Sequence, residues 1–418
     1  MIVFYCFTKP VKIEFTIGGN EGPIYTSNYE AVESKEEVVA EKIYFAPPSC
    51  VQNQIALLRK TYGNETDLIV LPVDAKAVTQ LKEYPLDISF ENFEDQFERF
   101  QGQETINIAF INAMSSGLGD HLIGMAAFDY WYKKLSYYLP NTNIVISFFQ
   151  INTIRTAEIT KQWSDKVNNI YMLPSNLVLL LAQDAYVDLG TFVMHDDFDE
   201  KNLFDFYLEA FAVDPTTVPV EEKRIKFDVS EELKMDAKDL LSEFNKENRP
   251  LLLVHHSSSS PIRSLDDGRA IKLIEELIAK TDYFIVSARP LEFENERFKD
   301  ISYCSTSLEK FAAIISQMDG IITVDTSTYH FADAFSVPTV ALFTTIEPEL
   351  RCKYYPYVKG IMLENKDGKL YGKHVLSIDG FEAKKELKYL AKLWDKINVD
   401  ELLNELNILI DKKKKDNK

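Results

Sequence analysis

The sequence contains little cysteine. Its 418 residues include four cysteines, and no two of them form a Cys-x-x-Cys pair. This spacing argues against a zinc site of clustered thiolates and against a disulfide-stapled fold, and it is typical of a reducing compartment. We therefore expect a cytoplasmic protein without a structural metal. The four positions are Cys6, Cys50, Cys304 and Cys352.

Positive charge is also scarce. The chain has 46 Lys and Arg against 65 Asp and Glu, a formal net charge of -19. Such an acidic protein is not expected to bind nucleic acid or an anionic membrane surface broadly. The only basic block, at 412–415, lies close to the last residue, where we expect a frayed, solubilising tail.

Long apolar runs are missing. The longest, such as residues 177–182, are far shorter than a bilayer-spanning helix requires, so we expect no transmembrane segment. Residues 1–10 (MIVFYCFTKP) have neither a basic region nor a small-residue cleavage site, so they predict a β-strand rather than a signal peptide.

Glycine is scarce as well, with 15 in the chain, yet three fall in the stretch 115–124 (SSGLGDHLIG). Gly117 and Gly119 would allow a tight turn between an apolar strand and a helix. Asp120 would then stand at the helix N-terminus. There it could cap the helix in the ordinary way, or it could act as a catalytic carboxylate, and both interpretations stay open. A dinucleotide loop is disfavoured, because the third glycine position of that motif holds Leu122.

The chain is longer than a typical domain with one hydrophobic core, and its pattern of apolar and polar residues changes along the sequence. We expect a β-rich α+β module over residues 1–104, a first lobe over 105–225, a second lobe over 226–380, and helices with a basic tail over 381–418. The crossing between the lobes, 216–230 (TTVPVEEKRIKFDVS), predicts an exposed, charged strand.

Both lobes alternate strand-like with helical segments. Residues 106–113 (INIAFINA) are typical of a strand buried on both faces, and residues 269–280 have the spacing of an amphipathic helix. Such alternation predicts doubly wound parallel α/β sheets, whose ligands bind at the carboxyl ends of the strands. The apolar face of that helix comprises Ile271, Ile274, Leu277 and Ile278.

A polar cluster follows the first strand of the second lobe, at 255–264 (HHSSSSPIRS). Hydroxyls, backbone amides and Arg263 could cradle a phosphate, or the serines could simply cap the next helix. A metal site at His255 and His256 is disfavoured, because adjacent strand residues point to opposite faces.

Another polar cluster lies in the segment 319–345. Asp325 ends a strand, Thr326, Ser327 and Thr328 supply hydroxyls at the start of a helix, and His330, which can carry charge, falls in the first turn. Together these groups suit a pyrophosphate.

Taken in chain order, the stretch 115–124 and the two polar clusters resemble the motifs of the heptosyltransferase family of inverting GT-B glycosyltransferases. The resemblance extends over about residues 106–380. The stretch SSGLGDHL is similar to the family's small-residue turn and Gly-Asp-x-Leu. His256, the serines after it and Arg263 resemble its phosphate loop, and VDTSTYHFADAFSVPTVALF resembles its Asp-Thr-Gly-like turn with a nearby His. The resemblance implies two Rossmann-like, doubly wound lobes facing a cleft.

The sequence departs from the family pattern in several places. Ser327 replaces the usual Gly, Thr344 and Thr345 replace Gly-Pro, and Arg263 stands where Lys is commoner. A β-rich module ahead of the same core resembles the autotransporter protein heptosyltransferases, but the cysteine-rich iron site of those members is missing from this sequence.

The resemblance implies roles for these residues. Asp120 would be the general base for an acceptor hydroxyl, and a nucleoside diphosphate would leave from an ADP-heptose-like donor without a metal or other cofactor. The implied donor-binding residues are Ser258, Ser259, Arg263, Asp325, Thr326, Ser327 and His330. The candidate acceptor-side residues are Ser116, Gly117, Gly119 and His121.

Residues 195–200 (HDDFDE) contain an Asp-x-Asp, the metal signature of a different glycosyltransferase fold, and we interpret it as structural or acceptor-side.

The acidic charge favours a protein or soluble glycan acceptor, and a homo-oligomer remains open. Two rival interpretations remain, namely a catalytically inactive GT-B scaffold that binds a sugar nucleotide or a partner protein, and another sugar-nucleotide enzyme such as an epimerase or hydrolase.

Overall fold

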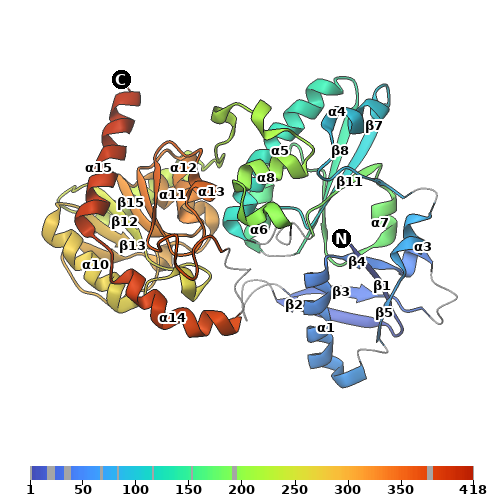
Figure 1. The fold of residues 1–418 in the computed structure, drawn as a ribbon, viewed down its shortest axis with the longest axis horizontal. Helices are drawn as coiled ribbons and strands as arrows, with labels where there is room; N and C mark the ends of the chain where they lie inside the picture. Colours follow the sequence, from blue (N-terminus) through green and yellow to red (C-terminus); the bar gives the residue numbers. More distant parts are fainter. Residues whose placement is uncertain are drawn as a thin grey trace. The chain divides into compact units, whose positions relative to one another are not determined.

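The computed structural model describes residues 2–16, 24–32, 39–65, 69–81, 84–114, 117–151, 154–190, 195–373 and 380–417. The chain forms two compact units, shown with their elements in Figure 1. The first unit comprises residues 1–195 and 205–218, and the second comprises 196–204 and 219–418. The first unit therefore holds both the predicted N-terminal module and most of the predicted first lobe.

The first unit combines strands with helices. They are β1 (Val3–Phe7), β2 (Val11–Thr16), β3 (Ile24–Tyr29), β4 (Tyr44–Ala46), α1 (Pro48–Tyr62), β5 (Val70–Pro72), α3 (Ala75–Thr79), β6 (Leu86–Asp87), α4 (Phe93–Phe97), β7 (Thr105–Ile111), α5 (Leu118–Tyr138), β8 (Asn143–Gln150), α6 (Ile154–Lys161), β9 (Asn169–Met172), β10 (Ser175–Asn176), α7 (Leu177–Leu181), β11 (Ala185–Asp188) and α8 (Leu203–Ala210), which begins in the second unit.

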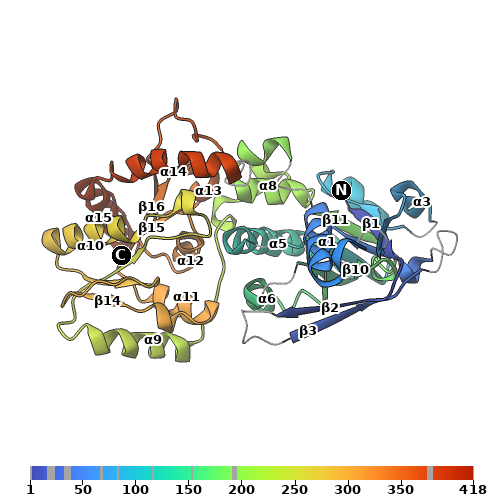
Figure 2. The ribbon, with the colours of Figure 1, turned by 90° about the horizontal axis from the view of Figure 1, so that it is seen from below.

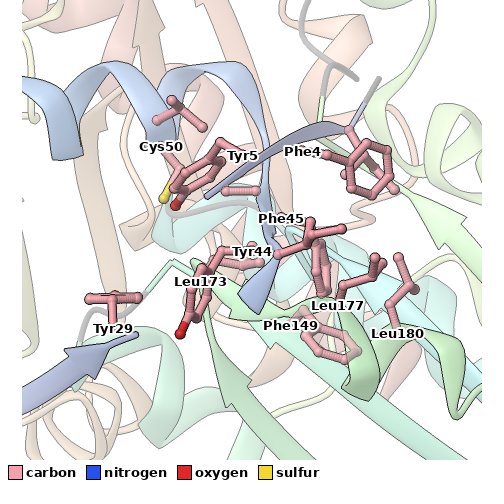
Figure 3. Packing of buried hydrophobic residues seen from close by; sticks show 14 of the residues in the cluster. Phe4, Tyr5, Tyr29, Tyr44, Phe45, Cys50, Phe149, Leu173, Leu177 and Leu180 are labelled. Carbon is pink, nitrogen blue, oxygen red and sulfur yellow. The ribbon is translucent and has the colours of Figure 1, made fainter. Parts of the chain in front are cut away.

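The N-terminal module and the first lobe share their sheets. Strand β10 of the lobe joins the antiparallel sheet of the module, in the order β10-β4-β1-β5, and β6 joins the parallel sheet of the lobe, in the order β6-β11-β7-β8-β9. Figure 3 shows the buried cluster between them, where the Phe45 and Phe149 rings lie 5.1 Å apart. The module is thus packed into the lobe through a common apolar core rather than attached by a linker.

The second unit is built on a six-stranded parallel sheet, in the order β14-β13-β12-β15-β16-β17. Its elements are α9 (Glu231–Phe244), β12 (Leu251–His255), η9 (Pro261–Arg263), α10 (Asp267–Lys280), β13 (Phe284–Ser287), β14 (Phe298–Asp300), α11 (Leu308–Ser316), β15 (Gly320–Val324), α12 (Thr328–Ala334), β16 (Thr339–Phe343), α13 (Glu349–Cys352), β17 (Val358–Met362), α14 (Gly380–Trp394) and α15 (Val399–Asp416).

Helices cover both faces of this sheet, with α10 and α15 on one side and α9 and α11 on the other (Figure 2). Strand β15 is wholly buried because both of its faces are covered. Leu406 of α15 packs closely over Gly320, where a Cβ atom would lie 3.1 Å from its side chain. This arrangement confirms the doubly wound α/β sheet expected for the second lobe.

Two sequence expectations are wrong. Residues 216–230 form no strand; instead Ile225, Phe227 and Val229 are buried, and Arg224 pairs with the buried Asp333 of α12 at 2.8 Å. The basic tail is not frayed, because α15 continues through it to Asp416. Apolar burial and an ion pair fix the crossing, and the tail is the last turn of a docked helix.

The cysteines and helices agree with the compositional expectations. All four cysteines are free thiols. Among the described residues, every helix is too short or too polar to cross a lipid bilayer.

Candidate functional site

The predicted donor-site residues gather at the carboxyl ends of three neighbouring strands, β12, β15 and β16. After β12 the chain forms the 3-10 turn η9, which carries Arg263. Two contacts fix this turn. The Thr344 hydroxyl, directly after β16, donates to the Ile262 carbonyl at 3.0 Å, and the Ile262 side chain belongs to a buried cluster with α14. Thr344 therefore supports the loop that carries Arg263.

Arg263 and Asp325 form the centre of this site. The Arg263 guanidinium donates through Nη1 to Asp325 Oδ2 at 3.0 Å and through Nη2 to the Ser259 hydroxyl at 3.1 Å. The other carboxylate oxygen of Asp325 accepts a hydrogen bond from the Tyr329 hydroxyl at 3.0 Å. The structure thus brings together three of the residues implied for the donor site, namely Ser259, Arg263 and Asp325.

The Asp325 carboxyl is ionised in this setting. Burial by itself would raise its pKa, but the charge and hydrogen bond of Arg263, the charge of Arg351 and the hydrogen bond from Tyr329 outweigh burial and hold the pKa below its ordinary value. A buried carboxylate with two donors is a rigid anchor for the arginine beside it.

The serine loop satisfies much of its own hydrogen bonding. The Ser258 amide donates to the Ser264 hydroxyl at 2.9 Å, and the Ser258 hydroxyl donates to the Ser260 carbonyl at 3.0 Å. Ser258 therefore shapes the loop in this structure, while Ser259 contacts Arg263.

The hydroxyls after β15 lie at the start of a short helix. Ser327 occupies the N-cap position of α12 without a side-chain hydrogen bond, and Thr326 beside it is half-buried. Helix α12 has only seven residues, so few aligned peptide dipoles contribute to the field at its start.

His330 is buried and uncharged at neutral pH. Its Nδ1 lies 2.8 Å from the Tyr355 hydroxyl. Burial lowers its pKa to about 3, opposed by the Asp325 carboxylate and assisted by Arg351. The expectation of a charged histidine here is corrected, and the positive charge of this edge comes from arginine.

The two histidines at the end of β12 take separate structural roles. His255 lies with Nδ1 2.5 Å from the Thr328 hydroxyl, and His256 is buried with Nε2 3.5 Å from Asp267. Nowhere in the described part of the chain do three or more His, Cys, Asp or Glu side chains gather so that they could hold a metal ion.

The predicted base belongs to the first unit. Asp120 lies in the first turn of α5, and Gly117, not Asp120, is the N-cap residue. A Cβ atom at Gly117 would lie 2.7 Å from Asp120 Oδ2, so the half-buried carboxylate folds back over this glycine. A side chain at position 117 would therefore displace the Asp120 carboxylate from its present place.

The remaining acceptor-side candidates differ in where the structure places them. His121 is fully buried, and its Nε2 lies 2.9 Å from the Thr160 hydroxyl. A side chain without exposed surface cannot contact an acceptor, so the expectation for His121 is corrected: it packs in the core. Gly119 lies inside the first turn of α5, and Ser116 lies outside the described residues.

The Asp-x-Asp stretch forms the short 3-10 helix η6 (Asp196–Asp199). Asp197 pairs with Lys201 at 2.7 Å, and the His195 ring stacks on Phe90 at 4.8 Å. These contacts support the structural interpretation of the stretch.

Sequence reasoning missed Arg351 of α13, which lies on the loop after β16 and is 6% exposed. No motif marks it. The available signal was its position, a cation a few residues beyond the carboxyl end of a buried strand, as for Arg263 after β12.

Residues 206–371 match the family model for glycosyltransferase family 9 (heptosyltransferase). A search of curated protein sequences found no match. Among solved structures, the chain is similar to ADP-heptose lipopolysaccharide heptosyltransferase II of E. coli, with 14% identity over 74% of this chain and 99% of that one and a TM-score of 0.51.

Two further similar structures have lower TM-scores. A family 9 glycosyltransferase from Veillonella parvula is 13% identical over 73% of this chain and 97% of that one, with a TM-score of 0.49. The iron-containing, dodecameric glycosyltransferase TibC from enterotoxigenic E. coli is 12% identical over 97% of this chain and 95% of that one, with a TM-score of 0.48.

The likeness to heptosyltransferase II shows a GT-B-like fold, in agreement with the two parallel sheets. The family model covers the segment that holds Arg263 and Asp325. The expected resemblance is thereby confirmed, and residues 206–371 are a glycosyltransferase domain of the heptosyltransferase family, family 9.

Proposed function

We propose that the protein is an inverting glycosyltransferase that takes its sugar from a nucleoside-diphosphate donor of the ADP-heptose type. The observation that carries this proposal is the Arg263–Asp325 ion pair, which lies inside the segment matched by the family model. Arg263 beside a loop of serine hydroxyls and amides has the chemistry of a phosphate-binding group.

In the proposed reaction, the acceptor oxygen forms a bond to the anomeric carbon from the face opposite the diphosphate, while the bond between that carbon and the diphosphate oxygen breaks. The Asp120 carboxylate takes the proton of the acceptor hydroxyl. The bonding electrons leave with the diphosphate, whose added negative charge is stabilised by Arg263 and the hydroxyls of Ser259, Thr326 and Ser327. His330, which is neutral, would contribute a hydrogen bond rather than charge.

We propose that this transfer needs no metal. In a metal-independent transferase the charge of the leaving diphosphate must be met by protein cations, and Arg263 and Arg351 bring two guanidinium groups to the edge that carries Asp325. The test is sugar transfer measured in the presence of a chelator, which should leave the rate unchanged.

The proposed acceptor is a protein or soluble glycan hydroxyl. The net charge of -19 would repel an anionic lipid surface. The N-terminal module, which shares a core with the first parallel sheet, is the proposed acceptor- or partner-binding element. The four free thiols fit the proposed cytoplasmic location, and a homo-oligomer stays a prediction.

The alternative is an inactive scaffold that binds a sugar nucleotide or a partner protein. It is favoured by the departures at Ser327, Thr344 and Thr345. The Thr344 hydroxyl, however, holds the Arg263 loop, so this departure supports the loop.

Release of nucleoside diphosphate from a panel of nucleotide sugars tests the proposal, measured with and without candidate protein and glycan acceptors. Acceptor-dependent release would support transfer. Release without an acceptor would support a hydrolase, and binding without any release would support the scaffold.

A further inference from the structure

Arg351 is a buried cation whose hydrogen bonds are only partly made. Helix α13, which carries it, packs against β17 at Gly360, where a Cβ atom would collide with the Pro348 ring. The Arg351 guanidinium donates through Nη1 to the Leu350 carbonyl at 3.0 Å and lies over the Phe198 ring at 5.6 Å. Its buried Nη2 has no hydrogen-bond partner among the residues that the structure describes.

A buried guanidinium is stable only if other groups balance its charge and its N–H donors. The carboxylate whose charge Arg351 feels is Asp325, and both oxygens of Asp325 already accept hydrogen bonds, from Arg263 and from Tyr329. Asp325 therefore pairs directly with Arg263 and acts on Arg351 through its charge alone.

Three other groups that feel the charge of Arg351 add no negative charge to it. His330, Tyr329 and Tyr355 are buried and uncharged at neutral pH. Arg351 thus adds a second guanidinium charge near the Arg263–Asp325 pair, together with an unused N–H donor. An anion rich in oxygen acceptors would neutralise that charge and accept from that donor.

We infer that Arg351 is a second diphosphate-binding residue, which holds the leaving diphosphate together with Arg263, and that Asp325 positions Arg263 rather than contacting the donor. This inference rests on the proposed function, because it concerns the same donor site. It adds a residue that the sequence motifs do not indicate.

The test measures binding of ADP, GDP, UDP, CDP and inorganic pyrophosphate by titration calorimetry, with the parent nucleosides as probes that lack phosphate. Arg351→Met removes the charge and keeps an apolar stem over Phe198. We expect its affinity for the preferred diphosphate to fall about ten- to hundredfold, the range for losing a charge-assisted hydrogen bond. Nucleoside affinity should not change, and Arg351→Lys should keep part of the diphosphate affinity.

A melting experiment separates this role from a structural one. Because Arg351 leaves one buried donor unpaired, Arg351→Met should melt without ligand at a temperature close to that of the wild type, while the shift caused by the diphosphate shrinks. If Arg351→Met does not fold, Arg351→Gln takes its place, because its amide can still donate to the Leu350 carbonyl.

Matched variants decide between the outcomes. Arg297 is a partly buried arginine whose Nη1 donates to the Thr281 carbonyl at 2.6 Å, away from this edge, so Arg297→Met should leave diphosphate affinity unchanged. Equal losses in Arg297→Met and Arg351→Met would overturn the inference. Full affinity in Arg351→Met with loss in Arg263→Met would overturn the inference and leave the proposed function standing. A wild type that binds none of the diphosphates would contradict the proposed function itself.

Discussion

The Nη1 atom of Arg263 lies 3.0 Å from Oδ2 of Asp325, which joins the loop after β12 to the loop after β15. Both loops follow the carboxyl ends of neighbouring parallel strands, the edge at which open α/β sheets bind their ligands. The pair therefore couples the stability of this edge to its proposed task of binding a diphosphate.

Breaking this pair should destabilise the second unit. Arg263→Met leaves the buried Asp325 carboxylate with the Tyr329 hydroxyl as its remaining hydrogen-bond donor, so we expect a loss of about 2–3 kcal/mol in urea unfolding. The double variant Arg263→Met/Asp325→Leu should lose less than the sum of the losses of the two single variants, without recovering donor binding. Additive losses in the double variant would contradict the coupling.

Asp120→Asn should abolish the proposed base and preserve the shape of the side chain. Turnover should fall about 10²- to 10⁴-fold, because an amide cannot take the acceptor proton. Donor affinity should stay unchanged, since donor binding is assigned to the second unit. Turnover close to that of the wild type would leave Asp120 as a first-turn helix residue and no more.

Gly117→Ala tests the same carboxylate from its neighbour. The new Cβ atom would lie 2.7 Å from Asp120 Oδ2, so the carboxylate must move, whereas the backbone at Gly117 is one that alanine adopts easily. We expect thermal stability to change little and turnover to drop. Gly268→Ala, which meets its nearest atom at 3.3 Å in the first turn of α10, is the matched control and should keep full activity.

The buried His330 makes stability depend on pH. Its folded-state pKa is lowered to about 3, below the unfolded value near 6.5, so the unfolded chain binds more protons between these values and stability falls as pH falls. Lowering the pH from 7 to 5.5 should cost about 1 kcal/mol through this group. Urea unfolding at both pH values measures this cost. The free energy of unfolding of His330→Gln should fall by about 1 kcal/mol less than that of the wild type between pH 7 and 5.5. An equal fall in both proteins would refute this account.

The sequence predicted the second unit well where burial dominates. The strands β12 and β15 and the amphipathic α10 appear where the pattern indicated, because strands buried on both faces and one-sided helices leave a clear signal. Ile274 and Leu277 of α10 are buried as expected, whereas Ile271 and Ile278 are partly exposed at the margin of that face.

Tertiary contacts explain what the sequence could not predict. Residues 216–230 have the alternation of a strand, yet their apolar side chains pack without a strand partner and Arg224 reaches Asp333, which is 109 residues away. The exchange of β6 and β10 between sheets likewise depends on contacts between distant segments. His330 and Arg351 acquire their character from burial, which a short motif does not encode.

The most direct measurement is the binding of nucleoside diphosphates and nucleotide sugars to the wild type and to Arg263→Met, by thermal shift without added metal. A ligand that binds only the folded state must raise the melting temperature. The account predicts stabilisation by one diphosphate and its sugar derivative, lost in Arg263→Met and retained in Asp120→Asn. No stabilisation of the wild type by any of them, or equal stabilisation of Arg263→Met, would contradict a donor site built on Arg263 and Asp325.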